Sequence, residues 1–264
     1  MKPQWCLAAP IAVSALAAIA LWAAGASGWL GEPGVAGLNY CEAARAGFAA
    51  QPANTWSNLA YVAVGILIGL RAMRDLGSVS APSNRMTTSP LHGSAYASVV
   101  ALIGPGSMAL HASTTRWGAT ADVFAMYVWA SFALAYAVQR LLGTTTRRFV
   151  ALWLALSALL TLRLLTGVPS LPDNFGFGIV VAAYACLEGY IVTSEPTRYD
   201  RRWLAVAALT FVVAFAIWRA SHTGGPLCDP HSLLQGHAVW HVLTAASAGA
   251  LYLFYRSEHF RRAR

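Results

Sequence analysis

Long runs of apolar residues alternate with short polar segments along the chain. Eight such runs have roughly the 17–25 residues that are needed to cross a hydrocarbon core about 30 Å thick. They cover residues 8–30, 54–72, 91–111, 120–141, 148–166, 174–194, 203–221 and 236–256. Lipid offers backbone groups no hydrogen-bond partner, so each run is predicted to be a helix. The pattern predicts an all-α, polytopic membrane protein without a soluble domain.

The first run has features of both a membrane anchor and a cleaved signal peptide. The basic residue Lys2 precedes its apolar stretch, and small residues occur near 24–27. Its apolar part is longer than that of a usual signal peptide, so we favour an uncleaved anchor. The predicted division is an N-terminal hydrophobic segment (1–35), a seven-helix membrane domain (36–258) and a basic tail (259–264).

The distribution of charge gives this arrangement a direction. Hydrophobic residues make up 57% of the 264 residues and charged residues 11%, against about 25% charged residues in soluble domains. The net charge is +8, and the Lys and Arg residues gather at alternate connections. The positive-inside rule makes the richer side, with the C-terminus, cytoplasmic. The membrane topology therefore explains the positive net charge, and nucleic-acid binding is not expected.

Five polar residues near helix ends fall on the predicted outer side. Ser107 and His111 lie one turn apart at the end of one predicted helix, and Asp122 opens the next. His237 and His241, in the stretch GHAVWH, lie one turn apart on one face of the last helix. The topology therefore brings all five to one side of the membrane.

Histidines four residues apart on a helix can bind one metal ion, although paired histidines also occur as polar caps at a membrane interface. His111 adds a third imidazole at the same depth, and three protein ligands with one open position are typical of a catalytic zinc. Such a site needs a carboxylate for proton transfer and a donor for the oxyanion. Asp122 and Ser107 could supply them. The alternatives are a helix N-terminal charge for Asp122 and a small packing residue for Ser107.

These residues resemble those of a known family, the alkaline ceramidases, within a wider group of seven-helix membrane hydrolases that includes the adiponectin and progestin receptor-type proteins. The resemblance rests on Gly106-Ser107-x-x-x-His111, on Asp122 eleven residues later, and on His237-x-x-x-His241. It spans the seven core helices, from about residue 39 to 255. In that family three histidines bind zinc, and the aspartate and serine complete the active site. The resemblance therefore implies a zinc-dependent hydrolase with a membrane lipid substrate.

The segment NYCEAARAGFAAQPANTWSN, before the first core helix, also resembles that family, whose eukaryotic members bind calcium there. In this chain Asn39 stands where an aspartate is expected, and Gln51 stands in place of a second glutamate. Glu42 is then the only charged candidate ligand. Since calcium prefers several oxygen ligands that usually include carboxylates, the sequence predicts at most a degenerate calcium site.

Two of the four cysteines, Cys41 and Cys228, fall in predicted outer segments. An oxidising outer compartment allows a disulfide, and the family resemblance implies a bridge between these two residues. The alternative is a pair of unpaired, semi-buried thiols.

The leading hypothesis is a zinc-dependent intramembrane amidase that hydrolyses ceramide or a similar N-acyl lipid to a long-chain amine and a fatty acid. It would lie in the cell membrane, with its active site at the outer side. Two alternatives use the same residues: a lipid ester hydrolase of the wider group, and a receptor-type protein with a structural zinc. A transporter is not favoured because the mid-membrane segments carry almost no charge.

Overall fold

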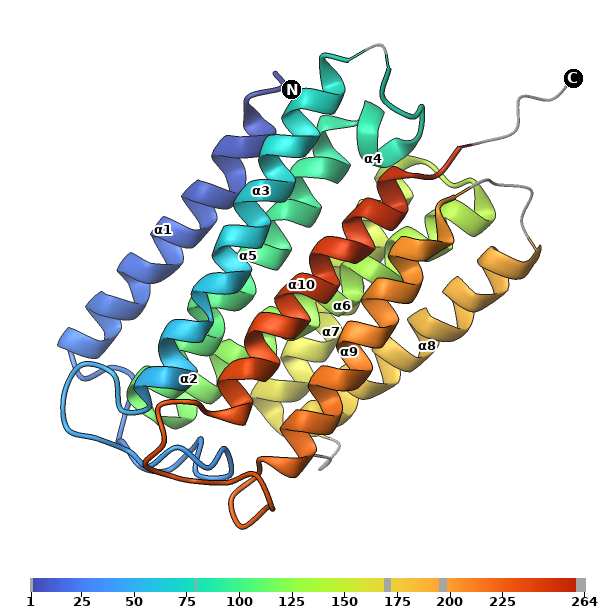
Figure 1. Ribbon diagram of the computed structural model, residues 1–264. Coiled ribbons are helices and arrows are strands. Elements are labelled where there is room, and N and C mark those ends of the chain that lie inside the picture. The colour runs from blue at the N-terminus through green and yellow to red at the C-terminus, as the bar shows by residue number, and fades with distance from the viewer. Residues whose placement is uncertain (1, 79, 169–171, 195–198, 260–264) are drawn as a thin grey trace, which may run out of the picture. The chain divides into compact units, whose positions relative to one another are not determined.

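The computed structural model describes residues 2–78, 80–168, 172–194 and 199–259, most of which form helices (Figure 1). The long helices are α1 (Trp5–Ala26), α3 (Leu59–Leu76), α5 (Pro90–Ser113), α6 (Arg116–Leu142), α7 (Thr146–Thr166), α8 (Asp173–Ser194), α9 (Arg201–Ala220) and α10 (Gly236–Arg256). Two short helices, α2 (Pro52–Ser57) and α4 (Arg85–Thr88), precede α3 and α5 in the chain. The all-α prediction is confirmed. Of the predicted basic tail, residues 260–264 lie outside the described residues.

Seven of the described helices are long and apolar enough to cross a membrane, and they are all the long helices except α3. Helix α3 has 18 residues but carries Arg71, Arg74 and Asp75 in its last two turns. The predicted run 54–72 is also divided, because α2 ends at Ser57 and α3 begins at Leu59. The chain is a multi-pass membrane protein in which this one run is less regular than its apolar pattern indicates.

The described chain forms two compact units that divide within α6. The first covers residues 1–122 and 198–260 and contains α1 to α5, the beginning of α6, α9 and α10. The second covers residues 123–197 and contains the rest of α6, with α7 and α8. In the second unit, Arg140 donates hydrogen bonds of 2.6 and 2.8 Å to the buried carboxylate of Glu188. Pairing of this kind offsets the cost of burying each charge.

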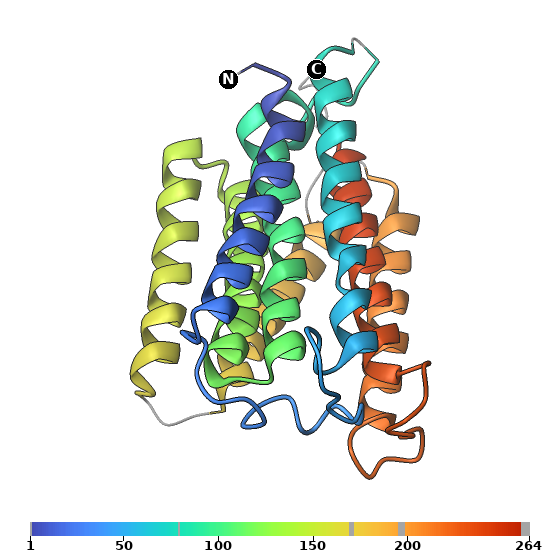
Figure 2. The ribbon, with the colours of Figure 1, turned by 90° about the vertical axis from the view of Figure 1, so that its left-hand side faces the viewer.

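In the first unit, α3, α5 and α10 pack against one another, α1 packs on α3 and α5, and α9 packs on α10. Figure 2 shows that the loop from α1 to α2 runs below one end of these helices, and the loop from α9 to α10 lies at the same end. The buried Tyr96 of α5 donates a hydrogen bond of 2.9 Å to the carbonyl of Ala248 in α10. Both loops therefore adjoin the C-terminal end of α5 and the N-terminal end of α10.

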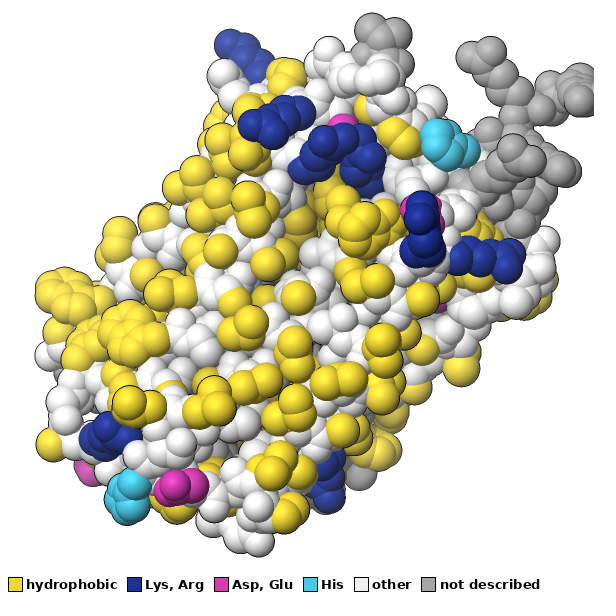
Figure 3. All heavy atoms as spheres, in the orientation of Figure 1, with side chains coloured by type: hydrophobic (Ala, Val, Ile, Leu, Met, Phe, Trp, Pro, Cys, Tyr) yellow, Lys and Arg dark blue, Asp and Glu magenta, His cyan; other side chains and the backbone are white. Residues whose placement is uncertain are grey.

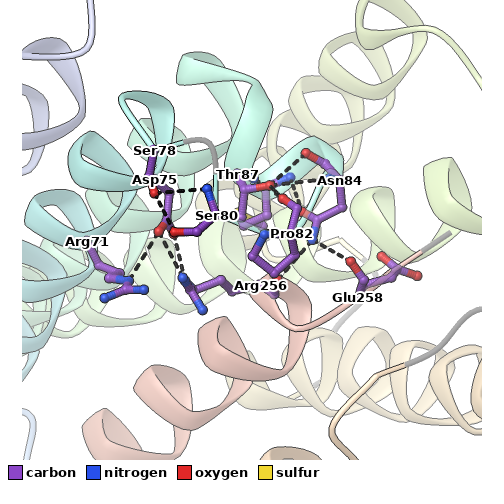
Figure 4. A network of polar contacts seen from close by, with 10 residues as sticks. Arg71, Asp75, Ser78, Ser80, Pro82, Asn84, Thr87, Arg256 and Glu258 are labelled. Carbon is purple, nitrogen blue, oxygen red and sulfur yellow. Dashed lines mark hydrogen bonds and ion pairs between the residues drawn. The ribbon is translucent and has the colours of Figure 1, made fainter.

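A polar network around Asp75 and Asn84 holds the other end of α10 (Figure 4). The buried carboxylate of Asp75 accepts hydrogen bonds of 2.7 and 2.9 Å from Arg256, and lies 3.3 Å from the guanidinium of Arg71. The amide of Asn84 donates to the carbonyls of Arg256 and Glu258, at 3.0 and 2.8 Å. It thereby satisfies the carbonyl of Arg256, which as the last residue of α10 has no partner within the helix, and that of Glu258 just beyond it.

The outward faces of α1 and α9 are strongly apolar. Leu16 and Ile19 of α1 have exposed fractions of 66% and 61%, and Leu209 and Val212 of α9 have 67% and 61%. Figure 3 shows hydrophobic side chains over the middle of the helices, and a concentration of Lys and Arg near the end that carries the N-terminus. Side chains of this kind at these places are typical of helices that face lipid.

Candidate metal centre and active site

Three buried histidines meet where the end of α5 adjoins the start of α10. His111 lies in the last turn of α5, and His237 and His241 lie in the first two turns of α10. One ring nitrogen from each lies within 4.8 Å of the others. The Nε2 atoms of His111 and His237 are 3.1 Å apart. The structure therefore brings together the three histidines that the sequence pattern selects.

A close approach between α5 and α6 brings Asp122 to Ser107. Helix α5 ends at Ser113, the residue that caps it, Thr114, has a left-handed backbone with φ of 52°, and α6 begins at Arg116. A Cβ atom on Gly118 would lie only 2.4 Å from the carbonyl oxygen of Ala109. Glycine is therefore required for the helices to approach so closely. One turn further along α6, the carboxylate of Asp122 lies close to Ser107.

A close approach between α9 and α10 positions the histidines of α10. A Cβ atom on Gly236, the first residue of α10, would lie 2.4 Å from the Cβ of Ser221 at the end of α9. The absence of a side chain at this position lets the start of α10 pack directly on α9. This contact fixes the position of the helical turn that carries His237.

The loop between α1 and α2 is tied to the loop between α9 and α10. Thr223 makes three hydrogen bonds to it. Its N–H donates to the carbonyl of Asn39 at 3.1 Å, its hydroxyl donates to the carbonyl of Leu38 at 2.8 Å, and this hydroxyl accepts from the N–H of Cys41 at 3.1 Å. A disulfide also joins Cys41 to Cys228. Leu38, Asn39 and Cys41 of the first loop are thus held from the side of the second.

This attachment places Tyr40 against the histidines. Its ring stacks on that of His237 with a centroid distance of 4.1 Å, and meets the ring of His111 edge-on at 5.3 Å. Burial raises the pKa of the Tyr40 hydroxyl to about 12, and the nearby carboxylate of Asp122 contributes to the same shift. Tyr40 therefore stays a neutral hydrogen-bond donor at physiological pH, beside both the histidines and the carboxylate.

The second ring nitrogens of two histidines have polar partners. Nδ1 of His111 lies 2.7 Å from Oε1 of Gln51, and Nδ1 of His241 lies 2.8 Å from the hydroxyl of Ser57. Nδ1 of His237 has no hydrogen-bond partner among the described residues. For His111 and His241, Nε2 is the nitrogen that remains to bind a metal ion.

The three candidate calcium ligands are not arranged as a calcium site. The carboxylate oxygens of Glu42 accept hydrogen bonds of 2.8 Å from the N–H groups of Ala53 and Asn54, at the start of α2. Oε1 of Gln51 faces His111, and the side chain of Asn39 belongs to an exposed residue. Calcium needs several oxygen atoms that converge. The arrangement of these residues does not fit it, and we assign calcium no part in the chemistry.

The histidine cluster does fit a zinc ion. In a tetrahedral site with Zn–N bonds of about 2.0–2.1 Å, the nitrogen atoms lie about 3.3 Å from one another. The Nε2 separation of 3.1 Å between His111 and His237 is close to this value. Three imidazole ligands also leave one coordination position for water or substrate, as in catalytic zinc sites.

The sequence pattern did not indicate a role for Tyr40 or Ser57 at this centre, and it indicated Gln51 only as a candidate calcium ligand. Gln51 precedes the proline that begins α2, and Ser57 is the last residue of this short helix. Polar residues are common at such helix ends, whatever their function. Only the fold shows that this helix lies against both α5 and α10. The sequence offered no signal for these contacts.

The comparisons with known proteins agree with this geometry. The model of one protein family, described as Ceramidase, matches residues 32–262, which is most of the chain. Helix α1 lies outside the matched range. A search of the curated proteins gives no match.

Proposed function

Because the chain belongs to the ceramidase family, we propose that His111, His237 and His241 bind a zinc ion that serves hydrolysis of the ceramide amide bond. Family membership makes the chain a membrane hydrolase that acts on this bond. The single observation that carries the zinc proposal is the convergence of three buried imidazoles, with one nitrogen each within 4.8 Å of the others. When bound, zinc would polarise the amide carbonyl and lower the pKa of water toward about 7.

Asp122 and Ser107 then have complementary roles. Hydrolysis places a water oxygen on the carbonyl carbon, breaks the C–N bond and adds a proton to the nitrogen. Asp122 accepts a proton from the attacking water and transfers it to the leaving nitrogen, which departs as a long-chain amine. The Ser107 hydroxyl, which lies close to Asp122, donates a hydrogen bond to the carbonyl oxygen as negative charge develops there.

We also propose that the active site lies on the non-cytoplasmic side and that the C-terminus is cytoplasmic. Arg71, Arg74 and Arg256 lie at the ends of α3 and α10 that are remote from the histidines. Because cytoplasmic ends are rich in Lys and Arg, the histidine end faces outward. The disulfide between Cys41 and Cys228 at this end agrees with an oxidising compartment.

The test is metal analysis of the purified protein together with release of fatty acid from a fluorescent ceramide. We expect about one zinc ion per chain in the wild type and in Asp122→Ala, with turnover lost from the variant. His111→Ala should lose both zinc and turnover. Zinc in the wild type without turnover on any ceramide would instead indicate a structural ion, as in a receptor-type protein. Absence of zinc from an active wild type would refute the proposal.

A further inference from the structure

We propose that Gln51 and Ser57, at the two ends of α2, are positioning residues that hold His111 and His241 in the tautomer that presents Nε2 to the metal. This inference rests on the proposed zinc site, because it concerns how that site is prepared. It assigns a function to a short helix whose residues take no direct part in the reaction. It also explains why α2 packs against both α5 and α10.

The orientation of the Gln51 amide follows from its surroundings. The residue has an exposed fraction of 1%. Its Nε2 lies 2.9 Å from the carbonyl oxygen of Gly37 and 3.1 Å from that of Glu42. Carbonyl oxygens can only accept hydrogen bonds, so the NH₂ group must face these two atoms. Oε1 is thereby turned toward His111.

The tautomer of His111 then follows from the same reasoning. Oε1 of Gln51 carries no hydrogen, and it lies 2.7 Å from Nδ1 of His111. Nδ1 must therefore carry the proton that makes this hydrogen bond, which leaves the lone pair of the neutral ring on Nε2. That atom lies 3.1 Å from Nε2 of His237, inside the cluster. The two carbonyl groups thus fix the orientation of the Gln51 amide, the amide oxygen fixes the proton on Nδ1, and His111 is left with Nε2 free to bind a metal ion.

Ser57 gives His241 the same tautomer by a shorter route. A hydroxyl has one proton, and the Ser57 hydroxyl lies 3.0 Å from the carbonyl oxygen of Asn54, which can only accept. Once that proton is used, the Ser57 oxygen is left to accept from Nδ1 of His241, at 2.8 Å. His241 consequently presents Nε2 as well. His237 lacks such a partner among the described residues, and the stacked ring of Tyr40 covers it instead.

Helix α2 is held firmly enough to act in this way. Pro52 begins it, and the carboxylate of Glu42 accepts the N–H groups of Ala53 and Asn54 at 2.8 Å. A carboxylate at this position is favoured by the helix dipole and by unpaired N–H groups. The backbone N–H of Gln51 also donates to the carbonyl of His111 at 2.9 Å. Gln51 therefore contacts His111 through both its main chain and its side chain.

The experiment measures zinc affinity by chelator competition and the state of the histidine rings by ¹⁵N NMR of the metal-free protein, both on the full chain in detergent or nanodiscs. Loss of a hydrogen-bond partner that orients a metal-binding histidine lowers metal affinity by about 10–100-fold. We expect Gln51→Met and Ser57→Ala each to weaken zinc binding by about this factor. Gln51→Glu keeps an acceptor for Nδ1 of His111 but loses the donor to the carbonyls of Gly37 and Glu42, so we expect it to recover only part of the affinity lost in Gln51→Met.

The matched control is Gln235→Met. Gln235 is equally buried, at 2%, and its Nε2 donates to the carbonyls of Asp229 and Ser232, but within the described part of the chain its side chain makes no hydrogen bond to an imidazole. Gln235→Met therefore removes a buried amide and its hydrogen bonds to carbonyl groups, as Gln51→Met does, but it removes no acceptor from a histidine ring. Equal loss of zinc affinity in Gln51→Met and Gln235→Met would overturn the proposal, as would unchanged affinity in Gln51→Met.

The NMR measurement separates this inference from the zinc proposal. In the metal-free wild type, the His111 and His241 rings should show a protonated Nδ1 and an unprotonated Nε2, and Gln51→Met should shift His111 toward a mixture of tautomers. This result would support the role of α2 even if the protein proved to bind a different metal. A wild-type His111 that is protonated on Nε2 would refute it, whatever the zinc content.

Discussion

Substitution of Gly118 by alanine should separate metal binding from turnover. A Cβ atom at this position would lie 2.4 Å from the carbonyl oxygen of Ala109 and 2.6 Å from the hydroxyl of Ser113. Cβ atoms do not approach backbone atoms within 3.0 Å, so the start of α6 must move away from α5 by about 0.6–1 Å. Overpacking of this size costs about 1–3 kcal/mol of stability.

The displacement acts directly on Asp122, one turn further along α6, and separates it from Ser107. A misplacement of about 1 Å in a catalytic group can reduce the rate by about 100-fold. The three histidines lie on α5 and α10, so zinc content should be unchanged. We therefore expect Gly118→Ala to lower kcat by about 10- to 100-fold with about one zinc ion per chain retained.

The assay is ceramide turnover with zinc analysis on the same preparation, after thermal unfolding has shown that the variant is folded. Gly178→Ala in α8 is the matched control, because a Cβ at Gly178 meets nothing within 4 Å. It should retain wild-type turnover. Wild-type turnover in Gly118→Ala, or a loss of zinc in proportion to the loss of turnover, would refute the reasoning.

Three further predictions follow from contacts around the first unit. Cys41→Ser should lower the free energy of unfolding by about 2–5 kcal/mol, and reductant should lower the Tm of the wild type but not of the variant; equal effects on both would contradict this. Asp75→Asn should lower the Tm, because it leaves the guanidinium of Arg256 without its carboxylate, while zinc content and KM stay unchanged; a loss of zinc would count against it. A calcium-selective chelator should alter neither turnover nor Tm, since backbone N–H groups already occupy the carboxylate of Glu42; calcium-dependent turnover would show that this is wrong.

The parts of the centre that the sequence predicts are those set by helical period and membrane sidedness. His237 and His241 share a face because they are four residues apart, and His111 joins them because its helix ends on the same side. The shared face and the shared side of the membrane need no knowledge of which helices are neighbours, whereas the contact of His111 with His237 depends on the packing of α5 against α10. The division of the run 54–72 was not predicted, because Asn58, where it breaks, is no stronger a helix breaker than its surroundings.

The functions of Gln51 and Glu42 could not be obtained in the same way. Both are polar residues in a loop, and the resemblance suggested them as calcium ligands. Their actual partners are an imidazole that is 60 residues away in the sequence and the first N–H groups of α2. Hydrogen bonds over such separations depend on how α2 docks against α5, and the order of residue types does not determine this contact.

Helix α10 is fixed at both ends, and this limits how the enzyme can open to admit a lipid. Its 21 residues span about 30 Å, with two of the three histidines at one end and the Arg256 contacts to Asp75 at the other. A slide by one residue would rotate the helix by about 100° and turn both histidines away from His111, besides breaking the ion pair. We therefore expect α10 to stay in place during the catalytic cycle, and the movement that admits ceramide and releases its products to take place in other elements.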